Sequence, residues 1–331
     1  MNAETAAPGA ALARAGVRFV KMHGLGNDFV VIDRRFQTFD PRPADIREMA
    51  DRHTGIGFDQ LLILDAPSRQ GDVGFGIFNA DGQAAEQCGN GLRCVARLFF
   101  ETSAKRRRDL VLESPAGLIP ARVLEDGRVA VDMGEPDFDP RSLPFAASPQ
   151  ARSYTLSAGD GEIRFGAVSM GNPHIVIPVA ETASAPVDTL GPELEAHPAF
   201  PRRTNVGFME VLGRDRIRLR VYERGCGETR ACGTGASAAA AVARHWGQTD
   251  RKVIVSLPGG ELEIDLVPEV VVHRTLNRLE LNARIDADFL PQGRLLRLGI
   301  PFVVGALILM PLAYYPAQLT VERIYGGETG Y

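Results

Sequence analysis

An internal repeat constrains the fold of this 331-residue chain more than any other feature of its sequence. The segment GNDFVVID at 26–33 resembles GNPHIVIP at 171–178, and CGNG at 88–91 resembles CGTG at 232–235. The spacing agrees as well, because the cysteine follows the asparagine of the first motif by 61 residues in the first copy and by 60 in the second. Repeats in register over this distance indicate two similar lobes.

Further polar residues repeat at matched offsets from the motif cysteines. Gln60 and Asn205 precede their cysteines by 28 and 27 residues, and Asn79 and Glu223 each precede theirs by nine. Short β-rich runs separated by turn residues lie between the motifs, and an apolar segment typical of a helix follows each cysteine motif. The sequence therefore predicts an α+β fold of two pseudo-symmetric lobes, each a mostly antiparallel sheet wrapped around a central helix.

Four segments are expected along the chain. The two lobes are placed at 17–150 and 151–270, with a proline-containing stretch between them at 140–149. An alanine-rich segment at 1–16 is expected to be a flexible extension, because it lacks the apolar core of a signal peptide. An atypical tail is expected at 271–331.

Charge and cysteine content narrow the class of protein. The 37 lysines and arginines against 41 aspartates and glutamates leave a net charge of −4, so no overall positive field would recruit nucleic acid. Four cysteines are too few for a disulfide framework: Cys88, Cys94, Cys226 and Cys232. We expect a cytoplasmic protein with reduced cysteines, in which Cys94 and Cys226 are structural.

A cysteine placed just before a helix is suited to acid–base chemistry. Helix N-termini offer unpaired N–H groups and a partial positive charge, which favour a thiolate and can also bind a carboxylate. Two such cysteines facing each other would suit inversion of a carbon next to a carboxylate. One thiolate removes the α-proton, and the opposite thiol returns a proton on the other face. This chemistry needs no cofactor.

The CGxG motif is also compatible with roles that involve no catalysis. A single copy is more often a tight turn with buried small residues, but two copies in register favour a site. The cysteine spacing does not fit a zinc site, and no GxxxxGK[ST] phosphate loop is present. A disulfide between Cys88 and Cys232 would be an inactive state in a reducing compartment.

Six motifs follow one another within about residues 19–265: KMHGLGNDFVVID, GFDQLLIL, FNADGQAAEQCGNGLRC, MGNPHIVI, TNVGF and YERGCGETRACGTGASA. Together they resemble the diaminopimelate epimerase family. The resemblance implies an isomerase that interconverts LL- and meso-diaminopimelate without cofactor or metal, in lysine and peptidoglycan precursor biosynthesis. It also implies an active site in the cleft between the lobes. Diaminopimelate is the one partner implied, and a homodimer is left open.

The resemblance also implies roles for individual residues. Cys88 and Cys232 correspond to the two catalytic bases, and His174 and Glu223 to groups that support proton transfer. The implied substrate-binding residues are Asn27, Gln60, Asn79, Gly89, Asn90, Asn172, Asn205, Glu223, Arg224, Gly233 and Thr234. The chemistry is suitable, because Arg224 can hold a carboxylate, Glu223 can face an ammonium group, and the amides offer donors and acceptors.

The end of the chain departs from this pattern. Residues 298–321 contain no charged side chain and are long enough to span a bilayer. The surrounding segment RLLRLGIPFVVGALILMPLAYYPAQL resembles a fragment of a membrane acyltransferase, to which we assign no activity. The run is either a membrane anchor, which would give membrane contact, or a fusion or frameshift scar; we favour the scar.

Two other functions are kept as alternatives. A proline or hydroxyproline racemase would share the fold and the cysteine pair, but the polar set argues for a longer, doubly charged substrate. An inactive or membrane-tethered binding protein would result if the tail disrupted the second lobe. Only an enzyme would exchange the α-hydrogen of its substrate with solvent.

Overall fold

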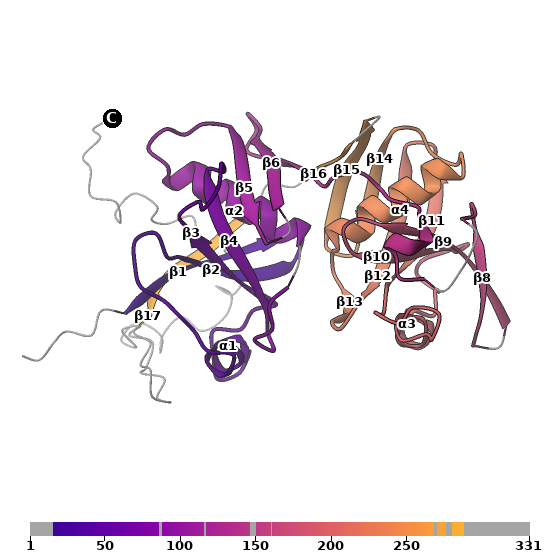
Figure 1. Cartoon of the computed structure of the whole chain (residues 1–331), viewed down its shortest axis with the longest axis horizontal. Helices are drawn as coiled ribbons and strands as arrows, with labels where there is room; N and C mark the ends of the chain where they lie inside the picture. Colours follow the sequence, from indigo (N-terminus) through magenta and orange to yellow (C-terminus); the bar gives the residue numbers. More distant parts are fainter. Residues whose placement is uncertain are drawn as a thin grey trace, which may run out of the picture.

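The structure is a computed structural model that describes residues 16–85, 88–115, 117–145, 150–159, 161–267, 270–275 and 280–287. Two sheet-rich lobes stand side by side, each around one helix (Figure 1). The first contains β1 (Val17–Gly24), β2 (Asn27–Asp33), α1 (Pro43–Ala50), β3 (Gln60–Asp65), β4 (Val73–Asn79), α2 (Gly89–Thr102), β5 (Asp109–Ser114), β6 (Gly117–Val123) and β7 (Val129–Asp132).

The second lobe follows a short 3-10 turn at Pro140–Ser142. It contains β8 (Tyr154–Ala158), β9 (Gly161–Ser169), β10 (Pro173–Pro178), α3 (Val187–Glu195), β11 (Asn205–Gly213), β12 (Arg216–Glu223), β13 (Gly227–Thr229), α4 (Gly233–His245), β14 (Lys252–Leu257) and β15 (Gly260–Val267). Two strands come last in the described chain, β16 (Val270–Thr275) and β17 (Glu280–Ala287).

The strand pairings of the two lobes follow one pattern. In the first lobe β1–β2 is antiparallel, β2–β3 parallel, β3–β4 antiparallel, β4–β5 parallel, and β5–β6–β7 antiparallel. The second lobe repeats these orientations through β9, β10, β11, β12, β14, β15 and β16. The prediction of two pseudo-symmetric α+β lobes is confirmed.

Each sheet encloses its central helix because that helix has almost no polar face. All residues of α4 from Gly233 to Ala243 are buried, and most of them are alanine, whose small side chains let the strands approach closely. Helix α2 buries its first turns in the same way and contacts β1, β6 and β7. The two helices therefore begin inside their lobes, where the cysteine motifs lie.

The last strands differ from the expectation of a tail that begins at residue 271. Strand β16 pairs with β15 and also with β7, where Val272 lies opposite Asp132. Strand β17 pairs with β1, so it occupies in the first lobe the place that β8 occupies beside β9 in the second. These strands cover sheet edges whose N–H and C=O groups would otherwise lack partners.

The segment 1–15 and the apolar run 298–321 lie outside the described residues. In the part of the chain that the structure describes, no helix combines the length and apolar character needed to cross a membrane.

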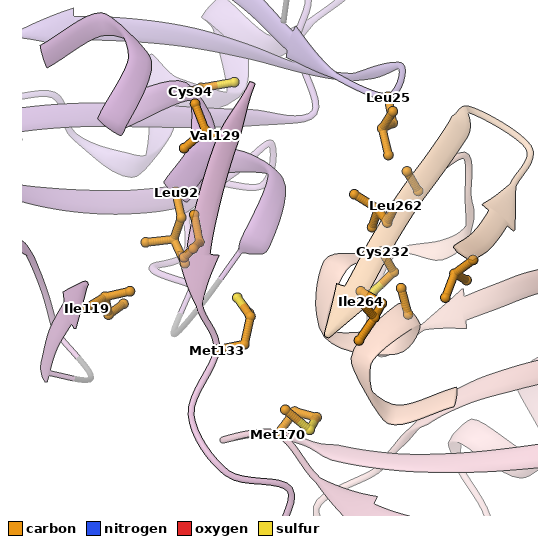
Figure 2. Close-up of a cluster of buried hydrophobic side chains, with 14 of the residues drawn as sticks. Leu25, Leu92, Cys94, Ile119, Val129, Met133, Met170, Cys232, Leu262 and Ile264 are labelled. Atoms are coloured by element: carbon orange, nitrogen blue, oxygen red, sulfur yellow. The ribbon is translucent and has the colours of Figure 1, made fainter. Parts of the chain in front are cut away.

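The lobes share one apolar core. A single cluster of buried side chains joins Leu92 and Ile119 of the first lobe to Leu262 and Ile264 of the second (Figure 2). Leu25, in the β1–β2 turn, points from the first lobe toward the strand that carries Leu262. The lobes are thus packed against each other close to the cysteine motifs.

Candidate active site

The two motif cysteines are the N-cap residues of the two central helices. Cys88 has extended backbone angles, and its Sγ accepts a hydrogen bond from the Gly91 N–H at 3.4 Å. Cys232 repeats this geometry, with its Sγ accepting from the Gly235 N–H at 3.3 Å. The N–H groups at 89–90 and 233–234 belong to the first turn, which has no acceptor for them within the helix, and that of Asn90 is directed at the Cys88 thiol. Each helix therefore presents a thiol and backbone donors at one point.

Asparagine side chains surround Cys88 in the first lobe. Asn27, at the start of β2, has its Oδ1 3.7 Å from the Cys88 Sγ. The same oxygen accepts from Asn90 Nδ2 at 3.2 Å, while Asn27 Nδ2 donates to Asp59 at 2.8 Å. The buried Asn90 also donates to the backbone oxygen of Ala231 at 2.8 Å. That bond crosses to the second lobe, next to Cys232, and brings the two cysteine motifs into one region.

The second lobe surrounds Cys232 with neutral polar groups. Thr234 Oγ1 lies 3.5 Å from the Cys232 Sγ and 3.5 Å from Asn172 Nδ2. His174 Nε2 lies 3.0 Å from Asn172 Oδ1. Burial and the nearby Arg224 lower the pKa of His174 to about 3, so its imidazole is neutral at physiological pH.

Glu223 lies at the end of β12. Among the site residues expected from the sequence, it is the one whose charge affects both thiols. Burial raises the pKa of its carboxyl group, although Thr229 Oγ1 donates a hydrogen bond to it and the Cys232 thiol lies within hydrogen-bonding reach. Its negative charge acts on both cysteines. Cys232 is therefore a direct neighbour of this carboxylate, and Cys88 lies close enough to feel its charge.

Both thiols are held protonated in this environment. Burial raises the pKa of Cys88 to about 12, opposed by the N–H groups of Gly91 and Asn90 and by the positive charge of Arg93. Burial and the charge of Glu223 raise the pKa of Cys232 well above its usual range. A thiolate would form here only after the surrounding charge changes.

The remaining expected residues lie around these groups. Gln60 on β3 is paired in register with Asn79 on β4 and donates to it at 2.9 Å. The other side-chain oxygen of this pair, Gln60 Oε1, is buried without a hydrogen-bond partner among the described residues. A buried acceptor without a donor is costly, so this oxygen is suited to a ligand N–H group.

Asn205 holds the backbone that carries Glu223 and Arg224. Its Nδ2 donates to the Pro173 carbonyl at 2.8 Å, and its Oδ1 accepts from the Arg224 N–H at 3.0 Å. The Arg224 guanidinium donates to the carbonyl of Arg202 at 3.3 Å and lies close enough to His174 to lower its pKa.

The sequence did not single out Asp59, Thr229 or Arg93, which also touch this region. Asp59 and Thr229 are hydrogen-bonded to expected residues, Asn27 and Glu223. Arg93 is fully buried in α2. The segment LRCVARLFF contains two arginines, Arg93 and Arg97, among apolar residues, and this was the signal available for it. The described residues contain no group of three or more His, Cys, Asp and Glu side chains arranged to hold a metal ion.

Comparison with known proteins identifies related sequences. The family model described as diaminopimelate epimerase matches residues 19–138 and 166–274. The diaminopimelate epimerase of Azotobacter vinelandii is 51% identical over 249 residues, which cover 75% of this chain and 90% of that protein. The diaminopimelate epimerase of Alkalilimnicola ehrlichii is 53% identical over 251 residues, with coverage of 75% and 90%.

Solved structures share the fold at lower identity. A hydroxyproline epimerase from Agrobacterium vitis superimposes with a TM-score of 0.61 at 19% identity, covering 83% of this chain and 92% of that one. A methylitaconate-delta-isomerase gives a TM-score of 0.53 at 15% identity, with coverage of 81% and 93%. These structures show the fold alone, whereas the family model and the relatives near 50% identity show that the chain belongs to the diaminopimelate epimerase family.

Proposed function

We propose that this protein interconverts LL- and meso-diaminopimelate by moving a proton on and off the α-carbon, with no cofactor. The observation that carries the proposal is the arrangement of Cys88 and Cys232, which cap equivalent helices of two pseudo-symmetric lobes and both lie within the influence of one carboxylate, Glu223. An inversion needs one base and one acid on opposite faces of a carbon, and paired thiols supply both.

In the proposed reaction the electrons and protons balance without another reactant. The thiolate of one cysteine takes the α-proton, so a C–H bond breaks and an S–H bond forms. The electron pair passes into the α-carboxylate, where the N-terminal N–H groups of the two central helices, at Gly89, Asn90, Gly233 and Thr234, would stabilise the added charge. The second thiol then gives its proton to the opposite face of the carbon and becomes the thiolate.

Substrate binding would supply the change of charge that the thiols need. The carboxylate of Glu223 raises the pKa of both cysteines in the free protein. A substrate ammonium group beside Glu223 would offset that charge, and a lower pKa would then favour the thiolate. The neutral His174, bonded to Asn172, would orient the amide next to Thr234 and Cys232.

The distal end of diaminopimelate would occupy the polar residues beyond the cysteines. Arg224 would bind the distal carboxylate, and the free oxygen of Gln60 would accept from the distal ammonium group. Asn79 and Asn205 would hold Gln60 and Arg224 in place.

Sequence identity favours this substrate over proline or hydroxyproline. The diaminopimelate epimerases share about half of their aligned residues with this chain, whereas the hydroxyproline epimerase shares 19%. For the chain as a whole, we propose lobes of about 17–150 and 151–270, with the later strand β17 completing the first lobe beside β1. We also propose a cytoplasmic location in which the four cysteines stay free.

Deuterium uptake from D₂O into the α-carbon of LL-diaminopimelate tests the function. We expect uptake together with formation of the meso isomer by the full-length protein. The variants C88A and C232A should each lose at least about a thousandfold of the epimerisation rate, since each lacks a base or an acid. The variant C226S removes an exposed cysteine outside the pair and should keep the rate. No uptake by soluble, reduced protein would refute the proposal and favour a binding protein.

A further inference from the structure

Arg93 is a buried cation that the mechanism above does not use. It lies in the second turn of α2 with 0% of its surface exposed. One nitrogen, Nη2, donates to Asn90 Oδ1, while Nε and Nη1 have no hydrogen-bond partner among the described residues. A buried charge of this kind destabilises the folded state unless an opposite charge compensates it. Its position therefore calls for a reason other than stability.

The hydrogen bonds of Arg93 determine how the neighbouring amides are oriented. Because Arg93 can only donate, the Asn90 atom that it contacts must be the oxygen. Asn90 Nδ2 is then turned toward two acceptors, Asn27 Oδ1 and the Ala231 carbonyl. Asn27 Oδ1 also lies next to the Cys88 thiol, so the chain of polar contacts runs from Arg93 to the reacting sulfur.

The charged groups around Arg93 and Cys88 come from few elements. The ionisable groups that act on Arg93 are Cys94 and Cys88, both from the first turns of α2. The largest charge effects on Cys88 come from Glu223, on β12 of the second lobe, and from Arg93. Cys94 is enclosed in the apolar core, which raises its pKa to about 12. The Cys88 thiolate is thus the anion that would compensate Arg93 when the site reacts.

The second lobe has no cation at the equivalent position. Five residues after Cys232 the chain has Ser237, where five residues after Cys88 it has Arg93. Two residues after each cysteine, Thr234 replaces Asn90. The lobes have the same fold and Glu223 acts on both thiols, but the positive charge of Arg93 opposes that effect at Cys88, and no cation of the described residues is among the main influences on Cys232.

We propose that Arg93 is a positioning residue for proton transfer at Cys88: it orients the Asn90–Asn27 pair that faces the thiol and supplies a buried positive charge whose counterion is the Cys88 thiolate. This inference rests on the proposed function, because a role in proton transfer requires that Cys88 takes part in the reaction. Its physical content, a link between Arg93 and the acidity of one of the two thiols, does not depend on turnover.

Site-resolved alkylation tests the link. Iodoacetamide labelling of the substrate-free protein, followed peptide by peptide by mass spectrometry across a range of pH, reports the ionisation of Cys88 and Cys232 separately. We expect R93M to slow the alkylation of Cys88 about tenfold or more at each pH where the protein is folded, because a nearby opposite charge is removed and less thiolate is present. The Cys232 profile, measured in the same digest, should stay in place. R93K, which keeps the charge, should leave the Cys88 profile near that of the wild type.

Turnover gives the second readout. R93M should reduce kcat by about tenfold to a hundredfold with a smaller change in KM, and R93K should recover part of that loss. V95A, which removes buried volume from the same helix without changing charge, should shift neither alkylation profile. R93Q is a second neutral variant, for use if R93M does not fold.

The outcomes separate this inference from the proposed function. An unchanged Cys88 profile in R93M or R93Q, or an equal shift in V95A, would overturn the role of Arg93 while leaving the epimerase intact. A wild-type protein without α-hydrogen exchange would refute the function, yet the alkylation profiles would still decide whether Arg93 controls Cys88.

Discussion

The carboxylate of Glu223 disfavours the thiolates in the free protein, but in the proposed reaction it also attracts the substrate group that makes a thiolate possible. It raises their pKa in the free protein and would be the partner of the substrate ammonium group when the site is filled. E223Q keeps the shape and loses the charge. We expect alkylation of Cys232 at neutral pH to become about tenfold faster, since its pKa falls, while α-hydrogen exchange becomes at least about tenfold slower.

The control for E223Q is E228Q, which changes a carboxylate in β13 that is paired with Arg220 instead of the thiols. E228Q should alter neither the alkylation rate nor the exchange rate. If E223Q and wild type are alkylated equally fast, the carboxylate does not hold the thiols protonated, and the proposed activation by substrate charge fails.

The positions of single residues could be predicted from the sequence where the internal repeat pointed to them. Cys88 and Cys232 were expected before helices, and both are N-caps. Arg93 was missed because its importance lies in burial and in a contact with Asn90, which no spacing in one sequence reveals. The roles of the polar set around the cysteines stay predictions, because proximity alone does not assign a role.

At the scale of elements, the first turn of each central helix positions its thiol. A Cβ on Gly235 would lie 3.3 Å from the Cys232 Sγ and 3.0 Å from Val221 Cγ2. A Cβ on Gly91 would meet the flexible end of Leu62 at 3.1 Å, with no sulfur atom among its nearest neighbours. The two equivalent glycines therefore differ in how closely they constrain the sulfur atom of the neighbouring cysteine.

G235A should slow α-hydrogen exchange about tenfold more than G91A does. Alanine is favoured over glycine in a helix by about 1 kcal/mol, so neither change should weaken its helix by propensity. In G235A the added methyl group displaces the sulfur, and displacement of about 1 Å can cost up to a hundredfold in rate. Exchange kinetics and thermal unfolding of both variants check this. A greater loss in G91A would contradict it.

Elements were predictable where apolar runs were short and bounded by turns, as in LLILD, which forms β3. The partners of those strands were not. The run VVVHRT gives no sign in the sequence that it pairs with both β15 and β7, because pairing between distant strands depends on how two lobes meet. For the same reason β17 was expected in a tail, although it pairs with β1.

The two lobes contact each other through two turns, the β1–β2 turn and the β14–β15 turn, that lie close to candidate site residues. A Cβ on Gly259, in the β14–β15 turn, would lie 1.7 Å from the Leu25 carbonyl oxygen in the β1–β2 turn of the other lobe. Gly259 N–H also donates to the Arg230 carbonyl at 2.7 Å. Leu25 and Arg230 each stand two residues before a site residue, Asn27 and Cys232. Backbone movement at this contact would reach both lobes of the site.

G259A should therefore impair catalysis and stability together. Because the obstructing atom is backbone, one of the turns must move, and we expect the free energy of unfolding to fall by about 1–3 kcal/mol. The α-hydrogen exchange rate should fall by at least about tenfold, since the two thiols lose their alignment across the substrate. G213A is the matched control, because a Cβ there has its nearest neighbour at an ordinary 3.4 Å and contacts a single lobe. Denaturant unfolding and exchange kinetics measure both variants. If G259A exchanges the α-hydrogen as fast as the wild type, the site tolerates movement between the lobes. The position of each thiol would then depend on its own lobe and not on the contact between the two turns.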